Sequence, residues 1–125
     1  MYSNTTPDEL MTELDTCWVN VGGENPAQYV LKYADRAPVV HLKDFVGHKS
    51  ENMYELIGED KKVANAVGFE FRPVGYGCQD WVSILDAAQK AGAEWVVVEQ
   101  DKATIGKTPL ESIEMSRNYL KTLGF

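Results

Sequence analysis

The segment Glu94-Trp95-Val96-Val97-Val98-Glu99 carries the strongest strand signal in this chain of 125 residues. Three consecutive valines favour an extended backbone, because β-branched side chains pack well on a pleated surface. An unbroken apolar run also predicts burial on both faces, as in a parallel sheet covered by helices. The segment is therefore expected to be a parallel strand that ends at a carboxylate, Glu99.

Other extended segments are predicted upstream of this strand. The run TELDTCWV at 12–19 lacks a helical apolar period and is rich in residues that suit a strand. The short apolar run at 39–42, Val-Val-His-Leu, predicts another strand. Residues 69–72 alternate apolar and polar types, which predicts a strand or hairpin arm with one face in water. Between 43 and 68 the pattern is least regular, with a short helix expected around 51–57.

Four helices are predicted from their start signals. Thr6-Pro7-Asp8-Glu9 forms a capping box with proline in the first turn, and later helices begin after Asn25, Asp80 and Thr108. Three-and-four spacing identifies the faces of these later helices that should be buried. The expected buried residues are Ala27, Val30, Leu31 and Ala34; then Trp81, Ile84, Leu85, Ala88 and Ala91; then Leu110, Ile113, Leu120 and Leu123.

Strands that alternate with helices indicate βαβ units and a parallel sheet, so the fold class is α/β. Three principal strands are few for such a sheet, because parallel strands must be covered on both faces. Exposed apolar edges promote association. We therefore expect the chain to form a homodimer or a larger homo-oligomer, with completion by a second protein as an alternative.

The composition excludes several classes of function. With 12 Lys and Arg against 19 Asp and Glu, the formal net charge is −7, which disfavours nucleic acid as a partner. No run of ~18 apolar residues predicts a membrane span, and the polar N-terminus lacks the apolar core of a secretory signal. Cys17 and Cys78 are interpreted as free thiols in a cytoplasmic protein, with a disulfide as the alternative.

Candidate metal ligands lie on the three principal strands or at their ends. They are Asp15, His41 and Glu99, and their wide separation in sequence means that each comes from a different strand. An imidazole with two carboxylates suits Mn²⁺, Mg²⁺ or Co²⁺ better than a thiolate site would. From the residues alone a second interpretation remains open, namely a hydrogen-bonded core histidine with two acidic residues that cap helices or form ion pairs.

Several segments resemble the C-terminal portion of the sugar isomerase/epimerase superfamily, the xylose isomerase-like TIM barrels. The matching segments, in the family's order, are 13–19 (ELDTCWV), 38–44 (PVVHLKD), 72–77 (RPVGYG) leading to Asp80-Trp81, 94–101 (EWVVVEQD) and the last helix at 108–124. The resemblance covers residues 1–125 as a single domain. It implies a partial TIM barrel, with three main parallel strands that correspond to the sixth to eighth strands. A complete barrel needs about 250 residues, so the resemblance implies only half of one.

The resemblance also assigns roles. Asp15, His41 and Glu99 match three of the family's four metal ligands, and Glu99 matches one of the two glutamates that exchange protons beside the carbonyl. Mn²⁺ is the expected ion, with Mg²⁺ or Co²⁺ as alternatives. The fourth ligand and the second glutamate belong to strands that this chain does not match.

Four further residues are predicted to bind substrate. Arg72 resembles a substrate-contacting arginine, and Asp44 lies in the same loop as His41. Lys43 could meet a phosphate or carboxylate, or it could be a solvated loop cation. Trp18 stands where many relatives carry histidine, so a sugar could stack on its indole, or the ring could belong to the core.

The predicted function is that of a metal-dependent sugar or sugar-phosphate isomerase/epimerase, or of its C-terminal half. Such an enzyme moves a proton next to a carbonyl through an enediolate. The alternatives are a non-catalytic remnant that binds sugar or metal, and a structural subunit that completes another chain's barrel.

Overall fold

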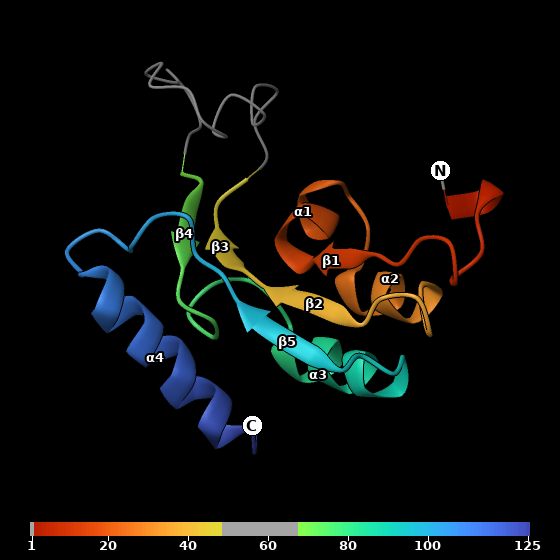
Figure 1. Ribbon diagram of the computed structural model, residues 1–125. Coiled ribbons are helices and arrows are strands. Elements are labelled where there is room, and N and C mark those ends of the chain that lie inside the picture. Colours follow the sequence, from red (N-terminus) through yellow and green to blue (C-terminus); the bar gives the residue numbers. More distant parts are fainter. Residues whose placement is uncertain (1, 49–67) are drawn as a thin grey trace.

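The computed structural model describes residues 2–48 and 68–125 (Figure 1). The expected helix around 51–57 lies outside the described residues. The elements in order are a 3₁₀ turn Tyr2–Asn4, β1 Glu13–Asp15, α1 Thr16–Val21, α2 Pro26–Lys32, β2 Val39–Leu42, β3 Asp44–Val46, β4 Glu70–Arg72, α3 Trp81–Lys90, β5 Trp95–Val98 and α4 Pro109–Thr122.

The three principal strands form one parallel sheet in the order β1-β2-β5. Asp15 is opposite His41, and His41 is opposite Val97, so the three strands end at the same edge. This confirms the predicted α/β fold with three parallel strands, and the described strands do not close into a barrel. The expected hairpin arm at 69–72 is β4, which pairs antiparallel with β3.

The hydrophobic core lies between this sheet and the helices α2 and α3, which pack side by side beneath it (Figure 1). Val40 and Leu42 of β2 point into this core and are fully buried. The predicted face of α3 is confirmed, because all its expected residues are buried there. They are Trp81, Ile84, Leu85, Ala88 and Ala91.

The opposite face of the sheet has no covering layer in the described part of the chain. Because residues paired in parallel register share a face, this side carries Asp15, His41, Trp95 and Val97. Trp95 is 68% exposed and Val97 is 42% exposed. The prediction that β5 is buried on both faces was therefore wrong, since β5 is an edge strand with helices on one side only.

The predicted strand at 12–19 ends early, because α1 begins at Thr16. Asp15 caps this helix: its carboxylate accepts hydrogen bonds from the backbone N–H groups of Cys17 and Trp18. The buried Thr16 hydroxyl donates to the carbonyl of His41 at 2.8 Å, which ties the start of α1 to β2. Cap formation thus outweighs the strand propensity of the following residues.

The structure also differs from the predicted first helix and from some of the predicted buried residues. Thr6 and Glu9 make the capping contact, but only a turn forms there. Leu31 is exposed, and Ala34 lies beyond the end of α2. Leu110 and Ile113 are exposed as well.

These two residues are exposed because α4 packs only through the face that carries Ser116 and Leu120. On that face Ser116 accepts a hydrogen bond from the backbone N–H of Val74.

Both cysteines are free, with Cys17 buried and Cys78 exposed. None of the helices in the described ranges is long and apolar enough to cross a bilayer.

A capping box begins α4 as predicted, and it makes the helix sensitive to acid. The N–H and hydroxyl of Thr108 donate to Glu111, and the backbone bond in particular lowers the pKa of the Glu111 carboxyl. A carboxylate with a lowered pKa stabilises the fold above its unfolded pKa and loses that contribution as the pH falls through its folded pKa. Between pH 6 and pH 3 the melting temperature of Glu111→Gln should therefore fall less than that of wild type, measured by circular dichroism. Glu114→Gln on the same helix is the matched control, and an equal fall in both variants would contradict the prediction.

Candidate metal centre

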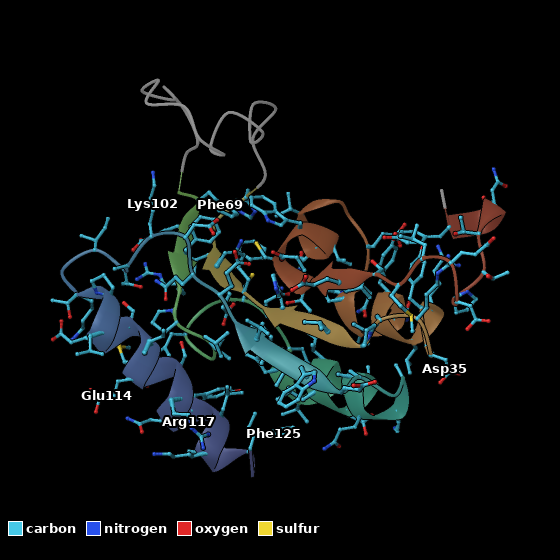
Figure 2. All side chains as sticks on the ribbon, viewed as in Figure 1. Asp35, Phe69, Lys102, Glu114, Arg117 and Phe125 are labelled. Carbon is cyan, nitrogen blue, oxygen red and sulfur yellow. The ribbon has the colours of Figure 1, made fainter. Side chains whose placement is uncertain are left out.

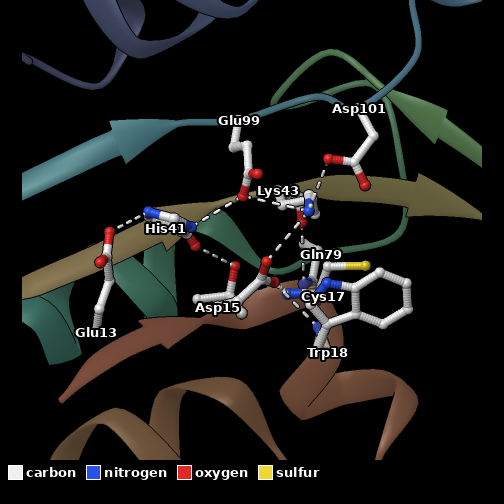
Figure 3. A network of polar contacts seen from close by, with 10 residues as sticks. Glu13, Asp15, Cys17, Trp18, His41, Lys43, Gln79, Glu99 and Asp101 are labelled. Atoms are coloured by element: carbon white, nitrogen blue, oxygen red, sulfur yellow. Dashed lines mark hydrogen bonds and ion pairs between the residues drawn. The ribbon is translucent and has the colours of Figure 1, made fainter. Parts of the chain in front are cut away.

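Three donor side chains converge at the carboxyl end of the parallel sheet (Figure 3). Asp15 ends β1, His41 lies within β2 and Glu99 directly follows β5. One ligand atom from each lies within 4.8 Å of the others. Glu99 is held there by the sheet itself, since its N–H donates to the carbonyl of Leu42 at 3.1 Å. The structure therefore brings together the three residues predicted from sequence to bind a metal.

The two carboxylate oxygens of Asp15 have different partners. Oδ1 accepts the capping N–H groups of Cys17 at 2.9 Å and Trp18 at 3.1 Å. Oδ2 faces the cluster, where the Lys43 ammonium lies 3.3 Å away. Burial raises the pKa of Asp15, and the Trp18 N–H and the Lys43 charge oppose that rise in part. One oxygen thus fixes the side chain and the other is available to a cation.

Both ring nitrogens of His41 face carboxylates. Nδ1 lies 2.9 Å from Glu99 Oε2, and Nε2 contacts Glu13 Oε1. A carboxylate on one imidazole nitrogen fixes the ring and its tautomer for a ligand at the other nitrogen. Glu13 was not predicted as a site residue, although its position two residues before Asp15 on the same strand face could have indicated it.

The Lys43 ammonium lies at the centre of the acidic groups. It is 3.3 Å from Asp15, 3.2 Å from Glu99 and 3.1 Å from Asp101, and its side chain is only 4% exposed. Burial by itself would lower the pKa of Lys43, but its acidic neighbours, Asp15 first among them, outweigh that effect and raise it. The interpretation of Lys43 as a solvated loop cation therefore does not hold.

Asp101 was also missed in the sequence, where only its place two residues after Glu99 could have pointed to it. Its carboxylate adds a third negative charge beside Lys43. Asp101 is not among the three residues whose ligand atoms converge.

The donor set fits a divalent ion. Atoms that share an ion at bond lengths of ~2.1–2.3 Å lie at most ~4.5 Å apart, and the 4.8 Å within which these ligand atoms lie is close to that limit. The ammonium of Lys43 already places a positive charge among the same oxygens. Burial raises the pKa of the Cys17 thiol, which disfavours a thiolate ligand in the same region. The roles of Asp15, His41 and Glu99 as metal ligands stay predictions.

Trp18 borders the site through its ring. The Lys43 ammonium lies 5.4 Å from the indole and 5.5 Å from the ring of Phe71, within cation–π range. Trp18 is half-buried and packs on Phe69 and Phe71, so it belongs to a small aromatic cluster. Stacking of a sugar on the indole of Trp18 stays a prediction.

Arg72 was predicted to contact the substrate. Its guanidinium pairs with Glu70 on the same strand at 2.8 Å.

A cavity of about 240 Å³ lies near this cluster. Its lining includes Phe71, whose ring lies 5.5 Å from the Lys43 ammonium, and Asp101, which forms an ion pair with Lys43. Phe69 and Lys102, two further lining residues, lie close together at one end of the molecule (Figure 2).

Asp44, predicted to bind substrate, is 1% exposed and its carboxylate is engaged with the protein itself. It accepts five hydrogen bonds, from the backbone N–H groups of Phe45, Gly75, Gly77 and Gln79 and from the indole N–H of Trp81. A Cβ at Gly77 would lie 2.1 Å from the same carboxylate, so this approach requires glycine. Asp44 thus holds the 75–79 loop against the end of β2, next to Lys43.

Comparison with known proteins agrees with this architecture. Residues 3–123 match the family model of the xylose isomerase-like TIM barrel. The chain belongs to this family.

Curated relatives of this xylose isomerase-like chain include inosose dehydratases. That of Lacticaseibacillus casei is 26% identical over 96% of this chain, and that of Clostridium beijerinckii is 31% identical over 91% of it. A crystal structure of a sugar phosphate isomerase/epimerase from Parabacteroides distasonis superposes with a TM-score of 0.68 at 25% identity over 95% of this chain. The chain spans only 40% and 39% of the two dehydratases and 33% of the crystal structure, which is consistent with a partial barrel.

Replacement of Asp44 by Asn should destabilise the fold by about 3 kcal/mol, because the amide group would point a donor at N–H groups that lose their acceptor. Asp80→Asn is the matched control. Asp80 is the exposed cap of α3, and Asn caps helices as well as Asp does. Urea denaturation followed by fluorescence measures both variants. Equal midpoints would show that the buried carboxylate does not organise the loop.

Proposed function

We propose that this chain is the metal-binding half of an enzyme that removes a proton from the carbon next to the carbonyl of a sugar, a sugar phosphate or a related polyol ketone. The observation that carries the proposal is the convergence of Asp15, His41 and Glu99 within 4.8 Å at the carboxyl end of three parallel strands. In barrels of this type, that end of the sheet carries the active site.

The names of the relatives denote different reactions, dehydration of an inosose and isomerisation or epimerisation of a sugar phosphate, and we infer one step that both reactions can contain. An isomerase or epimerase that works through an enediolate removes a proton beside a carbonyl and returns it at another carbon or on another face. A dehydratase that acts on an inosose, a cyclic polyol ketone, can remove the same kind of proton before a hydroxyl group leaves as water. Proton removal beside a carbonyl is therefore the reaction step that we propose for this chain.

The residues have distinct parts in this step. A divalent ion such as Mn²⁺ would polarise the carbonyl when bound. Glu99 would accept the proton, since its carboxylate lies at the open edge of the sheet and is 38% exposed. Without the ion, His41 Nδ1 holds Glu99 through the 2.9 Å contact; with the ion bound, the same nitrogen would be a ligand while Glu13 fixes the far side of the ring. The Lys43 ammonium adds a positive charge beside the oxygens that gather there.

A second candidate function is a non-catalytic module that binds sugar or metal. The observation that favours it is the short length of the chain, which spans about 40% of its curated relatives. The resemblance also assigns the second proton-transferring glutamate to strands outside this chain. A structural subunit that completes another chain's barrel is the third candidate. A cytoplasmic location also stays a prediction.

Proton removal is tested by isotope exchange. With Mn²⁺ in D₂O, the protein should incorporate deuterium next to the carbonyl of at least one substrate in a panel of ketoses, ketose phosphates and inososes, detected by proton NMR. Glu99→Gln should reduce the exchange rate by at least about a hundredfold, since general-base catalysis contributes ~10²–10⁴. Glu114→Gln, on α4, is the control. Exchange that persists undiminished in Glu99→Gln would exclude Glu99 as the base, and no exchange with any substrate would favour the non-catalytic module.

Self-association is tested by size-exclusion chromatography with light scattering. The exposed Trp95 and Val97 lie on the open face of the sheet, so we expect a homodimer or larger assembly that covers it. Trp95→Glu should shift the mass toward a monomer. Val82→Glu, at an exposed position on α3, serves as the control. A well-dispersed wild-type monomer would contradict the expectation.

A further inference from the structure

One cation already occupies the acidic cluster, and it belongs to the chain itself. The Lys43 ammonium lies within 3.3 Å of three carboxylates, and it is 5.4 Å from the ring of Trp18 and 5.5 Å from the ring of Phe71. A lysine that is 4% exposed and surrounded in this way is held in place by its neighbours rather than by solvent.

The oxygens that Lys43 contacts are those that a metal ion would need. Asp15 Oδ1 is engaged with two backbone N–H groups, so Oδ2, the oxygen beside Lys43, is the one free to bind a cation. Glu99 Oε2 lies 2.9 Å from His41 and 3.2 Å from Lys43. A divalent ion between Asp15, His41 and Glu99 would therefore meet the ammonium at both carboxylates, and like charges at such distances repel strongly.

Asp101 differs from the other two acids. It is the nearest carboxylate to Lys43, at 3.1 Å, yet it stands outside the converging ligand set. It can therefore keep a hydrogen bond to the ammonium while Asp15 and Glu99 turn to another cation. Asp101 also lines the cavity of about 240 Å³, so an ammonium drawn toward it stays next to open space.

We propose that Lys43 is a built-in counter-cation that holds Asp15 and Glu99 together in the metal-free protein and competes with a divalent ion for them, while Asp101 retains the ammonium when the ion binds. This inference rests on the proposed metal site. It adds a role for Lys43 in metal affinity and assigns Asp101 as a positioning residue.

The competition predicts opposite effects for the two residues. Lys43→Met keeps a long unbranched side chain in this buried position but removes the charge, so it should tighten Mn²⁺ binding about tenfold or more, measured by isothermal titration calorimetry. Asp101→Asn should weaken Mn²⁺ binding several-fold, because the ammonium then stays on Asp15 and Glu99. In the Lys43→Met background the effect of Asp101→Asn should largely disappear, which separates retention of the ammonium from a general loss of negative charge.

The exposed pair of Lys90 and Asp86 on α3 supplies matched controls. Lys90→Met changes the net charge as Lys43→Met does, and Asp86→Asn changes it as Asp101→Asn does. Neither control should alter the Mn²⁺ affinity by more than about twofold, because exposed charges are screened. A thermal-shift series gives a second readout. Without metal, Lys43→Met should melt below wild type, and Mn²⁺ should raise its melting temperature more than that of wild type.

The outcomes distinguish this inference from the proposed function. If wild type binds Mn²⁺ and Lys43→Met binds it no more tightly, the competition is refuted while the metal site stands. If neither protein binds Mn²⁺, both proposals fail. Should Lys43→Met not fold, Asp101→Asn decides by itself, and an affinity equal to that of Asp86→Asn overturns the inference.

Discussion

The buried carboxylate of Asp44 is the contact on which the rest of the arrangement depends. Its five hydrogen bonds join the start of β3, the 75–79 loop and the indole of Trp81 at the start of α3. Trp81 is in turn a central residue of the core beneath the sheet. One side chain therefore couples the layer that stabilises the fold to the strand end that carries Lys43. Buried N–H groups without an acceptor would be strongly unfavourable, so the loop and the helix are positioned together around this side chain.

The two faces of the sheet have different roles: one packs against the helices and the other carries the candidate metal ligands. Residues such as Val40 and Leu42 face the helices and are fully buried, while Asp15 and His41 face the open side. Parallel register then brings acids from separate strands to one edge. The like charges of Asp15, Glu99 and Asp101 can approach one another because the Lys43 ammonium lies between them. The stability of the cluster and its affinity for a cation are thus set by the same few contacts.

Much of this was predictable from the sequence. The apolar run 39–42 and the spacing of Trp81, Ile84 and Leu85 depend on local periodicity, and both predictions are confirmed. The convergence of Asp15, His41 and Glu99 followed from strand ends that share an edge. The start of α1 was missed because TELDTCWV has strand propensity, and only the hydrogen bonds made by Asp15 reveal the cap. The central place of Lys43 depends on long-range packing against Trp18 and Phe71, which no local pattern encodes.

The open face also has an optical consequence. Trp81 is buried and Trp18 is half-buried in an aromatic cluster, whereas Trp95 is 68% exposed beside Val97. The emission of an indole shifts toward the blue when water around it is replaced by apolar groups. Any layer that covers this side of the sheet would remove water from Trp95, so the emission of Trp95 would report on the coverage of the open face.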